Sequence, residues 1–254
     1  MSTSLVGTSH GTDDPAGQAA VRAVLDGVRA ARPELDVREA FVDVQQPEVG
    51  EVLAGAVHDV GSAVVVPLLL STGYHVRHDI AQAVAAANAA DRAGPSPGST
   101  AVAVAAEPLG PHPLLVDILA DRYAAAEAAH GPFRSDDVVV LAAAGSSVAA
   151  AATAVEEVTS ALAQRLGRPV TPSYGAGAEP RVPAAVAAAR DGATPGARVI
   201  VVSYLLAPGY FLDRVLEAGA DVVTDPVAGA AGAEKADPRL VQVVLDRYDA
   251  AVRA

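Results

Sequence analysis

The chain has 254 residues, of which 51% are hydrophobic and 19% are charged, and it contains no cysteine. This length and apolar content predict one large or two smaller packed domains and exclude a disordered chain. Because there is no cysteine, the chain itself holds no disulfide, no Cys-ligated zinc and no iron–sulfur cluster. The formal net charge of -12 argues against nucleic acid and against an anionic membrane as partners.

The sequence also bears on where the protein works. Its amino-terminal residues lack the basic start and apolar core of a secretory signal. No uninterrupted apolar run reaches the roughly 18–20 residues that span a bilayer. We therefore expect a cytoplasmic protein without a membrane partner.

Eight strand-like stretches alternate with helical patterns along the chain. In the first half the expected strands are 4–9, 35–44, 62–70 and 100–108. In the second half they are 136–145, 168–174, 197–206 and 220–226. Several of these stretches are continuously apolar, which is typical of parallel strands covered by helices on both faces. The pattern therefore predicts an α/β fold with doubly wound parallel sheets.

The order of motifs repeats within the chain. The aligned segments are 5–11 with 140–146, 64–75 with 200–211, and 112–123 with 237–248. Three matches in the same order predict two homologous halves, at 1–125 and 136–254. We expect these halves to face a central cleft, where ligands of open α/β sheets usually bind.

The two predicted halves differ at two histidines. In the alignment His10 stands opposite Gly145, and His75 stands opposite Phe211. A requirement of the fold would act on both halves alike. The asymmetry therefore indicates chemistry confined to the amino-terminal half.

His10, His75 and Asp43 each follow an expected strand at the start of a turn. Neighbouring strand ends share one edge of a parallel sheet, so the three side chains are expected to meet in one cleft. Two imidazoles and a carboxylate suit Fe²⁺, Co²⁺ or Ni²⁺, and they also suit proton transfer near neutral pH. A lone histidine there is more often a satisfied polar residue or a helix cap than a ligand, and Asp43 is equally explained as the start of a turn. The occurrence of two histidines at equivalent positions favours function.

Five other ionisable side chains also need an assignment. Glu39 precedes Asp43 by four residues and would share its face on a continuous strand. His78 follows His75 by one helical turn, so it either shares a metal or proton with it or lies exposed on the helix. The remaining histidines, among them His112, are expected at the surface without partners.

Glycine, serine and threonine cluster in turns that precede helices. The free backbone N–H groups of a helix start bind carboxylates, and an adjacent arginine adds positive charge. The residues expected to bind an acidic substrate are Gly11, Thr12, Ser71, Thr72, Gly73, Arg77 and Ser146. The alternative is that these residues only cap the helices.

Three motifs carry a family resemblance, and all lie in the amino-terminal half. They are GTSHGTDDP (7–15), FVDVQQP (41–47) and PLLLSTGYHVRHDI (67–80). They resemble the CbiX/SirB-type class II chelatases, the sirohydrochlorin ferrochelatases of sirohaem synthesis and the cobaltochelatases of anaerobic cobalamin synthesis. The second half resembles the family through the internal repeat, and duplicated chains are one known form of it. Asp43 stands where the family commonly has glutamate, and Ala81 where it often has proline.

The resemblance implies that a metal-free tetrapyrrole binds in the cleft and receives a divalent metal there. His10 and His75 would coordinate or deliver the metal and accept the pyrrole protons, with Asp43 assisting. The implied substrates are sirohydrochlorin or a close relative and Fe²⁺, with Co²⁺ as the second choice. No permanently bound cofactor is needed. Because one chain supplies both halves, we expect a monomer.

Other functions are also compatible with these residues. The enzyme could be the cobaltochelatase of cobalamin synthesis, or a non-catalytic carrier could hold a tetrapyrrole or metal with the same histidines. A nucleotide-dependent enzyme is disfavoured, because neither G-x-G-x-x-G nor G-x-x-x-x-G-K-[ST] follows the first strand of either half.

Overall fold

The computed structural model describes residues 3–71, 73–92, 102–230, 232 and 235–254, and it leaves the side chains of residues 74–76 undescribed. The first half contains β1 (Ser4–Ser9), α1 (Pro15–Ala31), β2 (Val37–Phe41), α2 (Val49–Val60), β3 (Ala63–Pro67), α3 (Tyr74–Arg92), β4 (Ala103–Ala105) and α4 (Pro113–His130). The second half contains β5 (Val138–Ala143), α5 (Ala149–Leu166), β6 (Val170–Tyr174), α6 (Val182–Gly192), β7 (Val199–Tyr204), α7 (Tyr210–Leu216), β8 (Val222–Val223) and α8 (Pro238–Arg253). Each expected stretch contains a strand, which confirms the α/β class.

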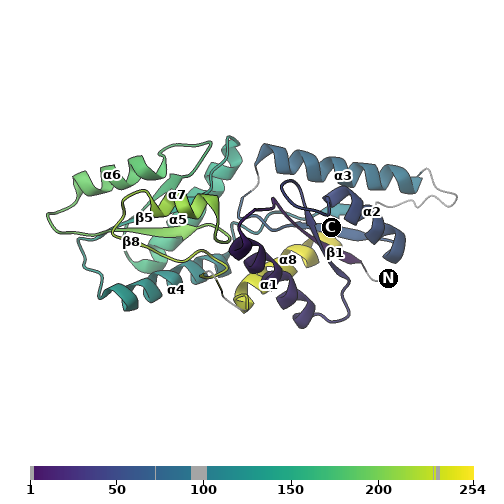
Figure 1. Cartoon of the computed structure of the whole chain (residues 1–254), viewed down its shortest axis with the longest axis horizontal. Helices are drawn as coiled ribbons and strands as arrows, with labels where there is room; N and C mark the ends of the chain where they lie inside the picture. The colour runs from purple at the N-terminus through teal and green to yellow at the C-terminus, as the bar shows by residue number, and fades with distance from the viewer. Residues whose placement is uncertain (1–2, 72, 93–101, 231, 233–234) are drawn as a thin grey trace.

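The strands form two four-stranded parallel sheets, in the orders β2-β1-β3-β4 and β6-β5-β7-β8. Figure 1 shows the two sheets side by side along the length of the molecule. All six residues of β1 are buried, as are all five of β3 and all six of β7. Helices therefore cover both faces of each central strand. The identical strand order confirms two homologous, doubly wound halves.

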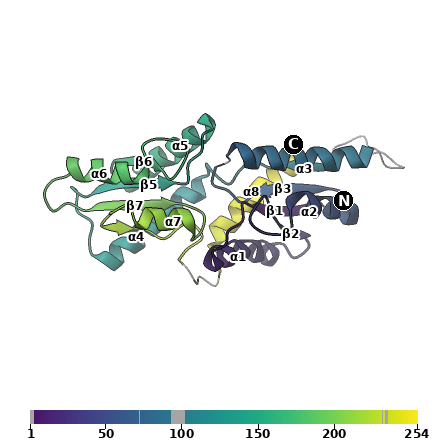
Figure 2. The same cartoon turned by 45° about the horizontal axis from the view of Figure 1, so that its top comes forward.

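The last helix of each half is exchanged between the sheets. Helix α4 follows the first sheet in sequence, yet it packs on β7 and β8 of the second, beside α5. Helix α8 packs in turn on β3 of the first sheet, beside α1, as Figures 1 and 2 show. The largest hydrophobic core consequently runs through both halves. The boundaries 1–125 and 136–254 stay a prediction, because each sheet is completed by a helix from beyond them.

The strand pairings correct the alignment of the repeat by one residue. The carbonyl of His10 accepts the N–H of Asp43 at 3.1 Å, and the carbonyl of Ala144 accepts the N–H of Ala176 at 2.8 Å. The next residues, Gly11 and Gly145, both have positive φ, at 94° and 84°. The structural equivalent of His10 is therefore Ala144, and the prediction that it is Gly145 was wrong. The shared left-handed turn, which favours glycine, fixes this register.

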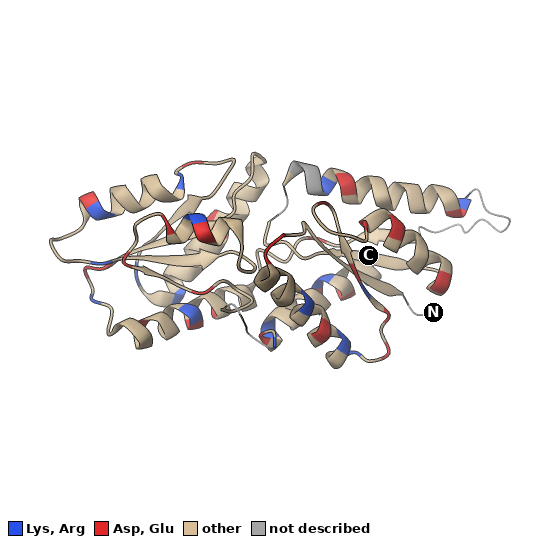
Figure 3. Ribbon diagram, viewed as in Figure 1, with Lys and Arg blue, Asp and Glu red and all other residues tan. Residues whose placement is uncertain are grey.

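Charged residues of both signs are distributed over the two halves, as Figure 3 shows for the described part of the chain. Within the same residues, the structure has no helix with the length and apolar character of a membrane span.

Asp137, just before β5, is expected to contribute strongly to stability. Its side chain is 0% exposed and lies 2.8 Å from the Arg198 guanidinium. Burial acts to raise its pKa, but the backbone N–H groups of Arg198 and Arg134 and the Arg198 side chain lower it to about 2. We expect Asp137→Ala to lower the free energy of unfolding by about 3 kcal/mol at pH 7, measured by chemical denaturation.

The pH dependence of this effect has a defined sign. Because the folded pKa lies below the ordinary 3.8, the stabilisation is complete at neutral pH and disappears as the pH falls toward 2. Asp136→Ala is the matched control, since the Asp136 side chain is 40% exposed and its ion pair with Arg134 is a surface pair. An equal loss of stability in the two variants would contradict this prediction.

Candidate active site

The turn that carries His10 rests on the loop that carries Asp43. His10 follows β1 directly, and its side chain is exposed. The two segments are joined by the backbone hydrogen bond between the Asp43 N–H and the His10 carbonyl. A Cβ at Gly11 would lie 2.5 Å from the Asp43 carbonyl oxygen, so glycine permits this close approach. The structure thus brings the two predicted segments together at the carboxyl edge of the first sheet.

Asp43 also stabilises its own turn. Its Oδ1 accepts the backbone N–H of Val44 at 2.8 Å, and Val44 has a φ of 55°. Strand β2 ends at Phe41, so Asp43 lies in the following loop with its side chain exposed. The turn-forming interpretation therefore holds, and it leaves the carboxylate at the surface beside the His10 turn.

Glu39 belongs to a different environment. Burial raises its pKa, while Arg22 and Arg29 of α1 act in the opposite direction. Because β2 ends at Phe41, the alternation that was expected to place Glu39 and Asp43 on one face does not continue to Asp43. Glu39 is therefore assigned to the packing of α1 on the sheet.

His75 is the second residue of α3. Its side chain lies outside the described ones, so its convergence with His10 stays a prediction. His78 is the fifth residue of α3, and its side chain is exposed. Its Nε2 lies 2.8 Å from the Gln82 amide nitrogen. Among the described side chains, no three His, Asp or Glu residues gather in an arrangement that would hold a metal ion.

The second half shows what surrounds the position equivalent to His75. Phe211 is the second residue of α7, and a Cβ at Gly175 would lie 2.7 Å from its ring. The N–H of Gly175 donates to Ala143, directly before Ala144, the equivalent of His10. In this half, therefore, the residue at the His75 position contacts the loop that corresponds to that of Asp43, and this loop is bonded to the strand end just before the position equivalent to His10.

Several of the predicted binding turns are internally bonded. The Thr12 backbone N–H donates to Gln45 Oε1 at 3.0 Å, and Thr12 Oγ1 accepts the Asp14 N–H at 3.1 Å. Ser146 Oγ likewise accepts the Val148 N–H at 3.1 Å. Both hydroxyls therefore stabilise the turns just before the helices and do not cap them, because the cap of α1 is the Asp14 side chain and α5 has no side-chain cap. Gln45, which the sequence reasoning missed, fixes the Thr12 turn against the Asp43 loop.

The carboxyl edges of the two sheets face each other. A Cβ at Gly73, in the turn after β3, would lie 3.9 Å from Ser146 Oγ, in the turn after β5. A Cβ at Gly209, in the turn after β7, would lie 3.5 Å from Thr12 Oγ1, in the turn after β1. Predicted binding residues of both halves are therefore neighbours.

A cavity of about 420 Å³ lies where the two halves meet. The first half contributes Ser71 and Arg77, two predicted binding residues, together with Glu107. The other residues that line the cavity are Pro67, Ile80, Ala81, Ala105, Ala106, Pro108, Gly110, Pro111, Val148, Ala150, Ala151 and Ala154. The last four come from the second half and are small or apolar. Thr72, a further predicted binding residue, lies outside the described residues.

Tyr204, at the end of β7, links the second half to the first. Its side chain is buried, and its hydroxyl donates to the Leu70 carbonyl, just before Ser71, at 3.3 Å. Burial raises the pKa of this phenol well above its usual range, so the hydroxyl remains a donor. A Cβ at Gly110 would lie 2.0 Å from it, which explains the glycine there. The sequence contained one indication of this role, because the repeat aligns Tyr204, a residue with a hydroxyl group, with the apolar Leu68.

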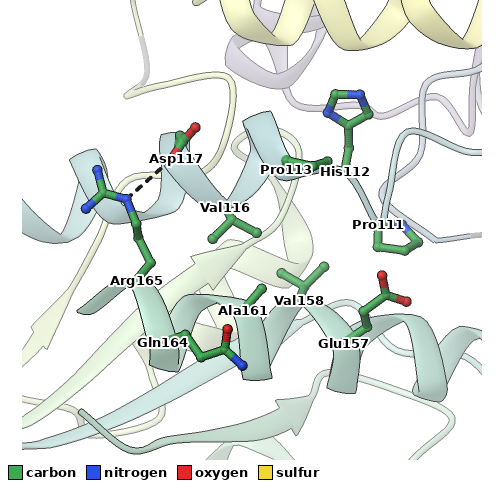
Figure 4. Close-up of a pocket in the computed structure, with 10 residues that line it drawn as sticks. All are labelled: Pro111, His112, Pro113, Val116, Asp117, Glu157, Val158, Ala161, Gln164 and Arg165. Atoms are coloured by element: carbon green, nitrogen blue, oxygen red, sulfur yellow. Dashed lines mark hydrogen bonds and ion pairs between the residues drawn. The ribbon is translucent and has the colours of Figure 1, made fainter. Parts of the chain in front are cut away.

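A second cavity, of about 480 Å³, lies between α4 and α5 (Figure 4). An ion pair between Arg165 and Asp117, at 3.3 Å, borders it. His112 lines it too, but its Nδ1 accepts the Leu114 N–H and its Nε2 lies 3.3 Å from Asp246. The expectation that His112 lacks partners was wrong, because it caps α4. This cavity includes none of the predicted site residues.

The family model named CbiX matches residues 4–126 and again residues 138–251. The chain belongs to the CbiX family. Both matches to this family coincide with the two homologous halves, and the resemblance drawn from the motifs is confirmed. The comparison with curated proteins found no match.

Three solved structures share the architecture of this CbiX-family chain. SirB from Bacillus subtilis with Fe³⁺ is 19% identical, with a TM-score of 0.76 over 98% of this chain and 95% of that one. SirB from Bacillus subtilis subspecies spizizenii in complex with cobalt is 18% identical, with a TM-score of 0.72 over 97% and 94%. CbiX, the terminal enzyme of sirohaem biosynthesis in denitrifying bacteria, is 21% identical, with a TM-score of 0.64 over 97% and 98%. These similarities show that the chain has the chelatase fold.

Proposed function

We propose that this protein is a sirohydrochlorin chelatase that inserts a divalent metal, Fe²⁺ by preference, into a metal-free tetrapyrrole. The observation that carries the proposal is the His10 turn held against the Asp43 loop, at an edge that faces the second half. Family membership supports it, since solved relatives are SirB with iron or cobalt and a CbiX of sirohaem synthesis. The same support extends to Co²⁺, the metal of the alternative cobaltochelatase.

In the proposed reaction, His10 and His75 ligate the incoming cation as it loses water. As bonds form from the ring nitrogens to the metal, the imidazoles leave the metal, and the protons of the two breaking pyrrole N–H bonds pass to the freed imidazole nitrogens. Neutral imidazoles are suited to both tasks, because they bind divalent metals and accept protons near neutral pH. Asp43, exposed beside the His10 turn, would take a proton onward to solvent.

The carboxylates of the macrocycle need positive charge or N–H donors in a chain of net charge -12. Arg77 and Ser71, which line the cavity between the halves, supply a guanidinium and a hydroxyl. Gly73 and Ser146 lie opposite each other at the same junction. We assign Gly11 and Thr12 to holding the His10 turn in place, in addition to their predicted part in binding.

The metal enters this scheme as a substrate, so no permanently bound cofactor is required. Nucleic acid and membrane partners are not expected for an acidic chain of this kind. We propose a monomer, because one chain supplies two sheets with facing edges.

Steady-state absorbance measurements with sirohydrochlorin and Fe²⁺ or Co²⁺ test the proposal. We expect many tetrapyrroles to be metallated per protein molecule, with the rate proportional to protein concentration. A tetrapyrrole or metal carrier would instead give a single stoichiometric change. That outcome would refute the chelatase proposal.

A further inference from the structure

The chain is poor in aromatic residues, with three Phe, six Tyr and no Trp. Most of the described aromatic side chains are packed in the interior, as for Tyr123, Tyr174 and Tyr248. Tyr210 and Phe211 differ, since they are 66% and 36% exposed. Burying these two adjacent rings would stabilise the fold, and exposed apolar groups of this kind commonly mark a binding site.

The exposed pair lies at the edge where the two halves meet. Both residues begin α7, immediately after Gly209, whose Cβ position is 3.5 Å from Thr12 Oγ1 and 3.9 Å from Asp14 Oδ2. The first turn of α7 therefore abuts the turn that starts at His10. Phe211 also contacts Gly175, so its ring is supported from the second half.

The two rings meet edge to face, and an arginine lies beside one of them. The ring centroids of Tyr210 and Phe211 are 5.5 Å apart with an interplanar angle of 75°. The Arg214 guanidinium lies 5.3 Å from the Tyr210 ring centroid. Arg214 is 60% exposed and also pairs with Glu217 at 3.0 Å. An aromatic surface with an adjacent cation suits a flat, conjugated ligand that carries carboxylates.

The repeat gives this surface a functional meaning. Phe211 occupies the position of His75, and Ala144 that of His10, so the second half has apolar residues where the first half has its two histidines. We propose that Tyr210 and Phe211 form a stacking surface for the tetrapyrrole macrocycle, in which one ring lies against the macrocycle face and the other, at 75° to the first, contacts it with its edge, with Arg214 beside the carboxylates. The first half then supplies the metal chemistry and part of the carboxylate binding, and the second half supplies the aromatic contact with the ring. This inference rests on the proposed chelatase function and names the part of the second half that binds the substrate.

Binding of metal-free sirohydrochlorin, followed by its absorbance and fluorescence, tests this role. We expect Tyr210→Ala combined with Phe211→Ala to weaken binding about tenfold, in line with the effect of losing aromatic stacking. In the insertion assay the same variant should raise KM by a similar factor and leave kcat within about twofold. Tyr210→Leu with Phe211→Leu keeps apolar side chains without aromatic rings, and it should weaken binding to a comparable extent.

Leu216→Ala is the matched control, because Leu216 is an apolar residue of the same helix and is 56% exposed. We expect this control to bind sirohydrochlorin as the wild type does. If the double alanine variant bound sirohydrochlorin normally while the wild type catalysed insertion, the stacking surface would be wrong and the proposed function would stand. If the wild type failed to bind sirohydrochlorin, both proposals would fall.

Discussion

His10→Ala and His75→Ala should each reduce metal insertion into sirohydrochlorin by about 10³-fold, the usual scale for loss of a proton-transferring group. His10 is exposed and contacts Asp43 through its backbone carbonyl, which alanine retains. The fold and the thermal midpoint should therefore be unchanged for His10→Ala. Insertion rates at saturating metal and tetrapyrrole, together with thermal unfolding, measure the two effects separately.

His58→Ala provides the control for the histidine variants. His58 is an exposed imidazole in the last turn of α2, and removing it should leave insertion unchanged. We expect Asp43→Ala to have a smaller effect than either site histidine, about tenfold, because water can replace a proton-carrying carboxylate. Near-normal turnover by His10→Ala or His75→Ala would show that the residue concerned is not part of the catalytic machinery.

The fold was largely predictable because the strands of a doubly wound sheet are visible as apolar runs. The structure shortens most of them at the carboxyl end, as for β2, expected at 35–44 and observed at Val37–Phe41. At these ends the chain leaves the sheet and forms the turns that carry polar residues. The stretch 40–43, for example, contains the last residues of β2 and also Asp43, a candidate site residue.

The exchange of α4 and α8 was not predictable from the pattern of apolar residues. Such a pattern shows that one face of a helix is buried, but two homologous sheets offer equivalent surfaces for that face. The contacts that select the partner are long-range ones, such as Arg247 on the Leu109 and Pro111 carbonyls at 3.0 and 2.6 Å. Arg122 makes the corresponding bond to the Val227 carbonyl at 3.2 Å.

The neighbouring placement of the His10 and Asp43 segments was predictable, whereas the catalytic roles of these residues and the convergence of His75 stay predictions. His10 and Asp43 were found because strand ends of a parallel sheet share an edge. Gln45 and Tyr204 were missed, since their roles depend on a side chain reaching another loop or the other half. For Tyr204 the repeat contained a signal, a polar aromatic residue opposite Leu68, but only the fold shows its partner.

The helix exchange predicts that neither half folds alone as a monomer. A fragment of residues 1–134 would lack α8, which buries Leu240, Val243, Val244, Leu245 and Tyr248. At about 1.5–3 kcal/mol for each large apolar side chain, this loss is on the order of 10 kcal/mol. That is comparable with the whole stability of an ordinary domain. The fragment would also lose the Tyr248 hydroxyl bond to the Thr3 carbonyl at 2.6 Å.

Circular dichroism and light scattering on the fragments 1–134 and 135–254 test this expectation. Each fragment alone should be unfolded, or should dimerise by using its partner copy's terminal helix in place of the missing one. Mixing the two fragments should restore native ellipticity and metal insertion. As a control, residues 235–254 joined to 1–134 by a flexible linker should restore a folded first sheet. A folded monomer of 1–134 without this addition would contradict the prediction, because it would mean that α8 is dispensable to the sheet on which it packs.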